Sequence, residues 1–402
     1  MNEKNKKNIK FIIVIIIVAL VSFNTGLFVK SNVSNKSKDK EFLGKYNDLK
    51  EIIDQNFLFD YDKKSLNDGA YKGMFQALND PYTEYYTPEE FNALLEETSG
   101  EFAGIGVVVS ASDEGMIKVI NVMKDSPAEK AKIIPGDYII KVEGEEFDAN
   151  SMEDAISKIK GEENTKVKLT ILRNENKKNP KEIEKELERK IIEVDTVQKE
   201  SFDYKGKKIG YLKLTEFDEI SPKQFFKNLD ELENEEKIDG LIIDLRNNPG
   251  GMLSACLEIA DRFLDKGIIV TTKDKNGKEI VEKSDGNIDK IPLTILVNEN
   301  SASASEIFSG ALKDRNRAKI IGRTTYGKGI VQQIFPVSEE NDGVKITVSE
   351  YFTPSGKKIH EKGVKPDYEV ESKLNETEVG VENIDKDDQL KKAMEVLFEK
   401  IK

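Results

Sequence analysis

Residues 242–251, in the second half of the chain, read Ile-Ile-Asp-Leu-Arg-Asn-Asn-Pro-Gly-Gly. This stretch predicts a short apolar strand, interrupted by Asp244, that ends in a Pro-Gly-Gly turn before a helix. Glycines at such a turn leave backbone N–H groups free to approach a reacting atom. Taken alone, the same residues also fit an ordinary tight connection, so both interpretations stay open at this point.

A second junction between a strand and a helix carries Ser-Ala-Ser-Ala-Ser at residues 301–305, after the apolar strand predicted at 291–297. The small residues around Ser303 let a substrate backbone come close. A serine at a helix N-terminus lies where the helix dipole and free N–H groups stabilise negative charge. N-capping by one serine is the ordinary interpretation, but three serines in five residues exceed what a cap requires.

A third segment, residues 324–332, reads Thr-Thr-Tyr-Gly-Lys-Gly-Ile-Val-Gln. Lys328 lies between two glycines, and Gln332 follows four positions later, a spacing that puts both side chains on one side of a helix or strand. A lysine acts as a base only when it is neutral, and burial lowers its pKa from about 10.4. A lone lysine is more often a solvated surface charge.

Upstream, Gly104, Ile105, Gly106 and Val107 open a strand whose glycines would let N–H groups point into a concavity that holds a carboxylate. Ser-Pro-Ala at 126–128, Pro-Gly-Asp at 135–137, an apolar strand and a helix from Ser151 follow. This series resembles a PDZ domain over residues 97–174, and the resemblance implies that those first four residues bind a peptide C-terminus by strand addition. The chain departs from the pattern at Lys132, where a glycine would take a left-handed conformation more easily. An unrelated small β domain is the alternative.

Together, the three segments of the second half resemble the carboxyl-terminal processing (tail-specific) peptidases, and the resemblance runs from Asn79 to Asp367. It implies that Ser303 is the nucleophile and Lys328 the general base, with Gln332 orienting the lysine. It also implies an oxyanion hole made by backbone N–H groups, which come from Ala304 and from Gly250 or Gly251.

The N-terminus predicts a membrane anchor. Four lysines within the first ten residues precede the largely apolar residues 11–29, and a helix of that length rises about 28 Å, close to the hydrocarbon core of a bilayer. The positive charge predicts that the tail stays in the cytoplasm and that the rest is exported. A cleaved signal peptide is the alternative, although no Ala-x-Ala site ends the segment.

Composition excludes several classes of site. A net charge of −13 without a basic block argues against nucleic-acid binding. One cysteine and one histidine exclude an internal disulfide and a structural zinc site, and no P-loop is present, so no metal or other cofactor is expected. Cys256 lies in an apolar stretch and is expected to be a buried packing residue, while His360 lies in a charged, turn-like stretch that fits a Ser-His-Asp triad poorly.

These observations predict an α+β multidomain protein with five parts. They are a cytoplasmic tail and transmembrane helix (1–30), a linker and helical region (31–96), the PDZ-like domain (97–174), a mixed α/β peptidase core (175–370), and an acidic linker with a C-terminal helix (371–402). The charged residues 174–189 are expected to form an exposed connection between domains.

The function expected is that of a serine endopeptidase on the extracytoplasmic side of the cell membrane, cleaving exported polypeptides near or after C-terminal recognition through an acyl-enzyme. The helical region is a candidate for contacts in a homodimer. Two alternatives stay open: a catalytically silent PDZ scaffold, and an exported hydrolase of esters or cell-wall peptides.

Overall fold

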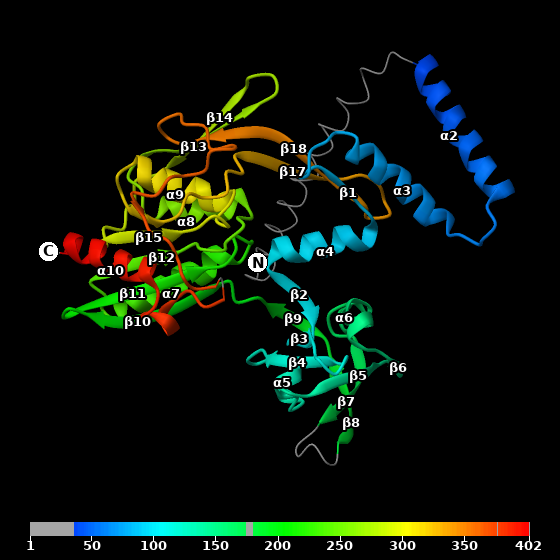
Figure 1. The fold of residues 1–402 in the computed structure, drawn as a ribbon, viewed down its shortest axis with the longest axis horizontal. Helices are drawn as coiled ribbons and strands as arrows, with labels where there is room; N and C mark the ends of the chain where they lie inside the picture. Colours follow the sequence, from blue (N-terminus) through cyan, green and yellow to red (C-terminus); the bar gives the residue numbers. More distant parts are fainter. Residues whose placement is uncertain (1–35, 174–179, 376, 402) are drawn as a thin grey trace, which may run out of the picture. The chain divides into compact units, whose positions relative to one another are not determined.

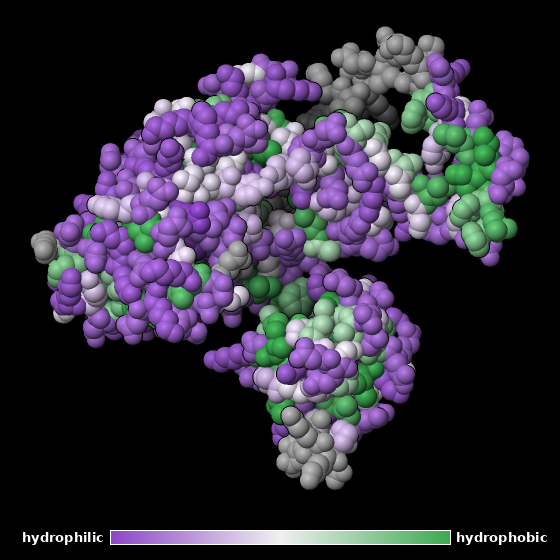
Figure 2. All heavy atoms as spheres, viewed as in Figure 1, coloured by the Kyte–Doolittle hydropathy of each residue, from purple (hydrophilic) through white to green (hydrophobic). Residues whose placement is uncertain are grey.

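A computed structural model describes residues 36–173, 180–375 and 377–401, which fall into two compact units, Met1–Ala70 and Tyr71–Lys402. In the first unit, helix α2 (Lys36–Asn56) is followed by the start of α3 (Lys63–Gln76). Tyr46 OH donates a hydrogen bond to Asn67 Oδ1 at 2.7 Å. Hydrophobic side chains gather on α2 and the loop after it (Figure 2), and the exposed ones are Phe42, Leu43, Leu49, Ile52, Phe57, Leu58 and Phe59.

The transmembrane helix expected over residues 11–29 lies outside the described residues. Within the described ranges, no helix has the length and apolar character needed to cross a bilayer. Helix α4 (Pro88–Ser99) begins with a capping box, in which Thr87 Oγ1 accepts the Glu90 N–H and Glu90 Oε2 accepts the Thr87 N–H.

The PDZ-like part is an antiparallel sheet with the strand order β3-β4-β5-β7-β8, and β6 pairs with β5 (Figure 1). Its core shows the alternation of a half-buried sheet, since Val167, Leu169 and Ile171 of β7 are buried. The bounds are β3 Val107–Ala111, β4 Ile117–Val122, α5 Pro127–Lys130, β5 Tyr138–Val142, β6 Glu145–Glu146, η1 Ala149–Ser151, α6 Met152–Ile159, β7 Lys166–Arg173 and β8 Lys181–Glu188.

The expectation of an exposed connection over residues 174–189 is wrong for its described part. Strand β8 pairs with the whole of β7, from Lys166↔Glu188 to Arg173↔Lys181. Ile183 and Leu187 contribute to the core, while most of the residues between them are charged. An edge strand with one buried face needs few apolar residues, so its composition is close to that of a loop. The PDZ-like sheet therefore extends to Glu188 and past the expected boundary at 174.

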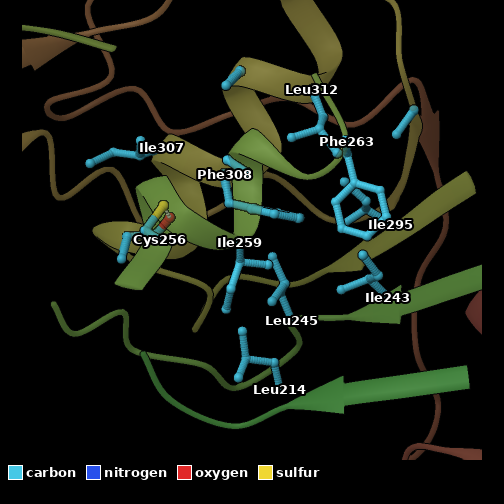
Figure 3. Close-up of a cluster of buried hydrophobic side chains, with 14 of the residues drawn as sticks. Leu214, Ile243, Leu245, Cys256, Ile259, Phe263, Ile295, Ile307, Phe308 and Leu312 are labelled. Carbon is cyan, nitrogen blue, oxygen red and sulfur yellow. Dashed lines mark hydrogen bonds between the residues drawn. The ribbon is translucent and has the colours of Figure 1, made fainter. Parts of the chain in front are cut away.

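The mixed α/β core is built on a six-stranded sheet with the order β10-β11-β12-β15-β16-β19, parallel from β11 to β19. Helices α7, α8 and α9 pack on one face and α10 on the other. Figure 3 shows side chains of α8 and α9 above the strands on the first of these faces. Every residue of β12 is buried, as expected for a parallel strand covered on both faces. The bounds are β10 Val197–Tyr204, β11 Lys207–Leu214, α7 Ser221–Asn234, β12 Gly240–Asp244, α8 Leu253–Asp261, β15 Leu293–Val297, α9 Ala304–Asp314, β16 Lys319–Gly322, β19 Tyr368–Glu369 and α10 Asp388–Ile401.

A second sheet has the order β1-β18-β13-β14, with β17 also paired to β18. Its first strand follows α3 and lies against β18 with Glu84 opposite Lys345. The two-stranded ribbon β2–β9 carries the chain into and out of the PDZ-like part. The bounds are β1 Glu84–Tyr86, β2 Glu101–Gly104, β9 Lys190–Glu193, β13 Gly267–Asp274, β14 Glu279–Ser284, β17 Ile330–Pro336 and β18 Gly343–Phe352.

Candidate active site

A buried ion pair supports the turn that follows β12. Arg246 donates from Nε to Asp244 Oδ1 at 3.0 Å and from Nη2 to Oδ2 at 2.5 Å, and both side chains are fully buried. Tyr211 OH donates to the same carboxylate at 2.6 Å. Burial opposes ionisation of Asp244, but the charge and hydrogen bonds of Arg246 hold its pKa below the usual value. The residues just before the Pro-Gly-Gly turn are therefore held in place by this ion pair.

Asn248 and Gly250 join this turn to the serine segment. The Asn248 carbonyl accepts from Ala302 N and from Ser305 Oγ, both at 3.0 Å. Gly250 has φ +111°, and a Cβ added there would lie 2.7 Å from Ser303 Cβ and 2.9 Å from Ala304 N. Only glycine fits such a close approach, so the turn and the serine segment are packed directly against each other.

Ser303 lies immediately before α9 in a strained conformation. Its φ of 51° and ψ of −113° fall outside the regions that a non-glycine residue prefers. Its side chain is half-buried, while the flanking Ala302 and Ala304 are buried. Strained backbone of this kind is concentrated at functional sites, where the surrounding structure holds it in place.

Glu306 holds the serine segment and the lysine loop together. Its buried carboxylate accepts from Ser303 N at 2.9 Å, Thr325 Oγ1 at 2.5 Å, Gly327 N at 2.7 Å and Lys328 N at 2.8 Å. Burial raises the pKa of Glu306, and these donors oppose that rise. One side chain thus fixes the backbone of both candidate catalytic residues.

Lys328 lies in the loop before β17, with its side chain half-buried. Its Nζ lies 4.5 Å from the centre of the Tyr82 ring. Burial, followed by the nearby charge of Lys345, lowers the pKa of Lys328. In the described part of the chain, this lysine forms neither an ion pair nor a side-chain hydrogen bond with Ser303. The lowered pKa favours the neutral amine that a general base requires.

Among the described residues, Gln332 makes no hydrogen bond to Lys328, although its spacing suggested that both side chains share one side. Its Nε2 donates to Thr347 Oγ1 at 3.2 Å. A bulge in the β17–β18 pairing, between Val331 and Gln332, interrupts the regular alternation of side chains. An orienting role for Gln332 stays a prediction.

Ser303, Lys328 and Gln332 line one cleft of about 500 Å³ together with Gly251 and Ala304. Among described residues, the N–H groups of Gly251 and Ala304 donate no hydrogen bond, whereas the Gly250 N–H donates to Asn248 Oδ1 at 2.8 Å. Of the two glycines expected at an oxyanion hole, Gly251 is therefore the one with a free donor. The remaining lining residues include Leu94, Glu97, Thr98, Glu216, Phe217, Met252, Ile307, Ile330, Lys345 and Tyr351.

Comparisons with known proteins find relatives over most of the chain. Family models match "Peptidase family S41" at residues 208–370, "PDZ domain" at 118–173 and "Activating protease CtpB N-terminal domain" at 23–90. The carboxy-terminal processing protease CtpA of Bacillus subtilis is 36% identical over 375 residues, covering 91% of this chain and 78% of the relative. The carboxy-terminal-processing protease of Bartonella bacilliformis is 33% identical over 350 residues, covering 85% and 78%.

The chain belongs to peptidase family S41. It is a serine peptidase of the carboxyl-terminal processing type with a PDZ domain, as the sequence predicted. A solved structure assigned to the S41 proteases, from Bacteroides fragilis, shares the fold, with a TM-score of 0.51 and 14% identity over 82% of this chain and 90% of that one.

Three further residues of this S41 peptidase, Tyr351, Glu216 and Glu306, lie at the site and were not predicted. Tyr351 OH donates to the carbonyls of Ser303, at 3.0 Å, and Lys328. Glu216 lies at the rim of the cleft, where burial and the nearby Glu97 and Asp218 raise its pKa to about 7. Glu306 could have been found from the Ser-x-x-Glu pattern that starts at Ser303, which is typical of a capping box.

Among the described residues, neither the lone cysteine nor the lone histidine makes a side-chain hydrogen bond to Ser303 or Lys328, although Cys256 Sγ donates to the Ala304 carbonyl at 3.2 Å. Cys256 is fully buried between α8 and α9 (Figure 3), and burial raises the pKa of its thiol, so its prediction as a packing residue is confirmed. The His360 backbone packs against Gly329, where an added Cβ would lie 2.1 Å from His360 N. Within the described residues, His360 makes no hydrogen bond to Ser303.

The four residues predicted to bind a peptide lie where the PDZ sheet begins. Gly104 ends β2, Ile105 is buried, and Gly106 has φ +76° with no room for a Cβ beside Ser126. Val107 starts β3, which pairs with β4 on one side and is an edge of the sheet. An edge strand presents unpaired backbone groups to which an extended peptide can add.

Proposed function

We propose that this serine peptidase is an endopeptidase in which Ser303 attacks the peptide bond and Lys328 is its general base. The observation that carries the proposal is the shared carboxylate of Glu306, which fixes the backbone of both residues beside one cleft. The strained Ser303 and the lowered pKa of Lys328 support the same roles.

The reaction follows from these positions. Neutral Lys328 takes the proton of Ser303 Oγ as that oxygen bonds to the substrate carbonyl carbon. The N–H groups of Gly251 and Ala304 stabilise the negative oxygen that results. Collapse of this intermediate breaks the C–N bond, and Lys328 returns the proton to the leaving amine. Water then hydrolyses the acyl-enzyme by the same proton transfers. Gln332 would orient Lys328 after leaving Thr347.

The substrate is an extended polypeptide recognised through its C-terminus. The free edge of β3 and the concave backbone at residues 104–107 support this recognition. The relatives described above are carboxy-terminal processing proteases, which agrees with it. The alternative, a silent scaffold, requires loss of Ser303 or Lys328, and the chain retains both.

We also propose that residues 11–29 anchor the chain in the cell membrane, with the peptidase on the extracytoplasmic side.

The exposed apolar side chains of α2 support contact between two copies of the chain, because such patches mark interaction surfaces. Light scattering of the full chain in detergent, compared with a variant in which Leu49 and Ile52 are both serine, tests the homodimer.

The catalytic proposal is tested by cleavage of an unstructured polypeptide with an apolar C-terminus by the full chain. Ser303→Ala and Lys328→Ala should each lower kcat/KM by at least about 1,000-fold, because nucleophile and base act as one unit. Lys283→Ala, at an exposed lysine of β14, is the matched control and should retain activity. Cleavage by a well-folded Ser303→Ala or Lys328→Ala variant at the normal rate, or no cleavage by the unmutated chain, would contradict the proposal.

A further inference from the structure

We propose that Tyr82 is a positioning residue for Lys328, whose aromatic ring holds the lysine side chain away from Ser303 until the segment 80–83 releases it. The inference rests on the proposed function in one respect, namely that Lys328 is the base. It concerns a residue that lies 246 positions from Lys328 in the chain but directly against it in the fold.

Tyr82 contacts the lysine loop at two points. The ring lies 4.5 Å from Lys328 Nζ, within the range of a cation–π interaction. Its hydroxyl lies 3.4 Å from the Tyr326 hydroxyl, two residues before the lysine. The hydrogen bond to Tyr326, and then burial, raise the pKa of Tyr82 to about 12, so its ring stays a neutral phenol at physiological pH.

The same segment is connected to Gln332 by a chain of hydrogen bonds through Thr347. Asp80 accepts from Tyr82 N at 3.0 Å and from Thr83 Oγ1 at 2.7 Å. Thr83 Oγ1 in turn accepts from Thr347 N at 3.0 Å, and Thr347 Oγ1 accepts from Gln332. Lys328 and Gln332 are therefore both directed toward residues 80–83 or their partner strand, and not toward each other.

The cation–π interaction acts on one protonation state of the lysine. An aromatic face attracts the ammonium and gains nothing comparable from the neutral amine, so the ring opposes the form that a general base needs. Other groups act on Lys328 as well: the charge of Lys345 favours the neutral form, while Asp80 and Glu306 favour the ammonium. Further polar groups nearby are Tyr326 in the same loop, Tyr351 on the Lys328 carbonyl and His360 beside Gly329.

It follows that the segment 80–83 links β1 to the lysine loop. These residues lie between α3 and β1, and β1 pairs with β18. A shift of the segment would free Lys328 from the ring and remove the hydrogen bond that Thr347 N donates to Thr83 Oγ1. The base would then be able to reach Ser303.

The test compares Tyr82→Leu with Tyr82→Phe in the full chain by the pH dependence of kcat/KM. Leucine keeps an apolar cover over Lys328 but removes the aromatic face, so the acid limb should move toward lower pH by roughly half a unit to one and a half. Phenylalanine keeps the ring and removes only the hydroxyl, so its acid limb should coincide with that of the unmutated chain. A merely structural loss would lower activity at every pH without moving the limb.

A second readout separates this inference from the catalytic proposal. In the Ser303→Ala background, the pKa of Lys328 can be measured by NMR of 13C-methylated lysines, with the signal assigned by its absence in Lys328→Arg. The pKa should be lower in Tyr82→Leu than in Tyr82→Phe even if no proteolysis is detected. Equal pKa values in the two variants, or a higher value in Tyr82→Leu, would overturn the inference.

Discussion

Gly250 and Ser303 lie so close together that residue 250 has no room for a side chain. The turn that presents Gly251 to the cleft can lie against the serine only because residue 250 has no side chain. The Gly250 N–H is already used by Asn248, so this glycine provides space and its neighbour Gly251 provides the free donor. Steric and electrostatic roles are thus divided between two adjacent residues that the sequence alone did not distinguish.

Gly250→Ala should lower kcat/KM by about 100-fold or more. The new Cβ would meet Ser303 Cβ and Ala304 N, and displacing an oxyanion-hole donor costs about 10²- to 10³-fold in rate. Steady-state kinetics on the polypeptide substrate checks this value. Gly277→Ala is the matched control, because Gly277 also has positive φ (+80°) but its nearest neighbour atom would lie 3.8 Å away. Equal losses in the two variants would show that backbone strain, and not the contact with Ser303, is responsible.

Residue types at the site could be predicted where a local pattern carries them, and not where the contact is distant in sequence. Ser303 and Lys328 each lie in a short run of small residues and glycines, which packing or capping alone does not require. Tyr82 reaches Lys328 through a fold that no local pattern describes. Gln332 likewise bonds to Thr347, which lies on the partner strand β18 and is not identified by the residues around Gln332.

Two short elements of the PDZ-like domain, the turn at Lys132 and the strand β8, depend on contacts with neighbouring strands. Lys132 follows α5 with φ +61°, in the left-handed conformation that the departure from glycine predicted. Its carbonyl accepts from Arg173 Nη2 at 2.8 Å, so the strained turn is held by a strand of the sheet. The strand β8 was missed because its alternation is diluted by charge, whereas β7, with three buried apolar residues, was predicted correctly.

Lys132→Gly should stabilise the PDZ-like domain by about 1 kcal/mol, because glycine adopts the left-handed conformation without the steric penalty of a side chain. Hydrogen exchange of the β5 and β7 amides in the full chain measures the change without isolating the domain. Lys130→Gly, two residues earlier within α5, should change protection in the opposite direction, since glycine is unfavourable inside a helix. Destabilisation by both variants would mean that contacts of the Lys132 side chain stabilise the domain by more than its left-handed backbone destabilises it.

In the whole molecule, the C-terminal segment packs as part of the mixed α/β core. Residues 371–402 were expected to form an acidic linker and a helix, and α10 is present at the predicted place. The structure adds that Leu390, Ala393 and Leu397 are fully buried against the central sheet. Composition could not predict this packing, because an amphipathic helix does not identify the surface that covers it.

Asp387 connects this segment to the buried ion pair that precedes the Pro-Gly-Gly turn. Its carboxylate lies 2.9 Å from Arg246 Nη1, both side chains are fully buried, and Arg246 also holds Asp244 before the Pro-Gly-Gly turn. The same carboxylate accepts from Gly380 N and Leu390 N, so it orders the start of α10 as well. A charge 141 residues away in sequence thus completes the support of the Pro-Gly-Gly turn.

Asp387→Ala should therefore lower the free energy of unfolding by about 3–5 kcal/mol, because it leaves the Arg246 guanidinium buried without one of its two carboxylates. Activity should fall at temperatures where the chain is still folded, since the turn that carries Gly251 loses rigidity. Thermal unfolding and kcat/KM measured on the same sample check both effects. Asp385→Ala, at an exposed carboxylate two residues away, should change neither. An Asp387→Ala chain that kept its stability and its activity would contradict the structural coupling, whereas lost stability with undiminished activity below the transition would restrict Asp387 to holding α10 in place.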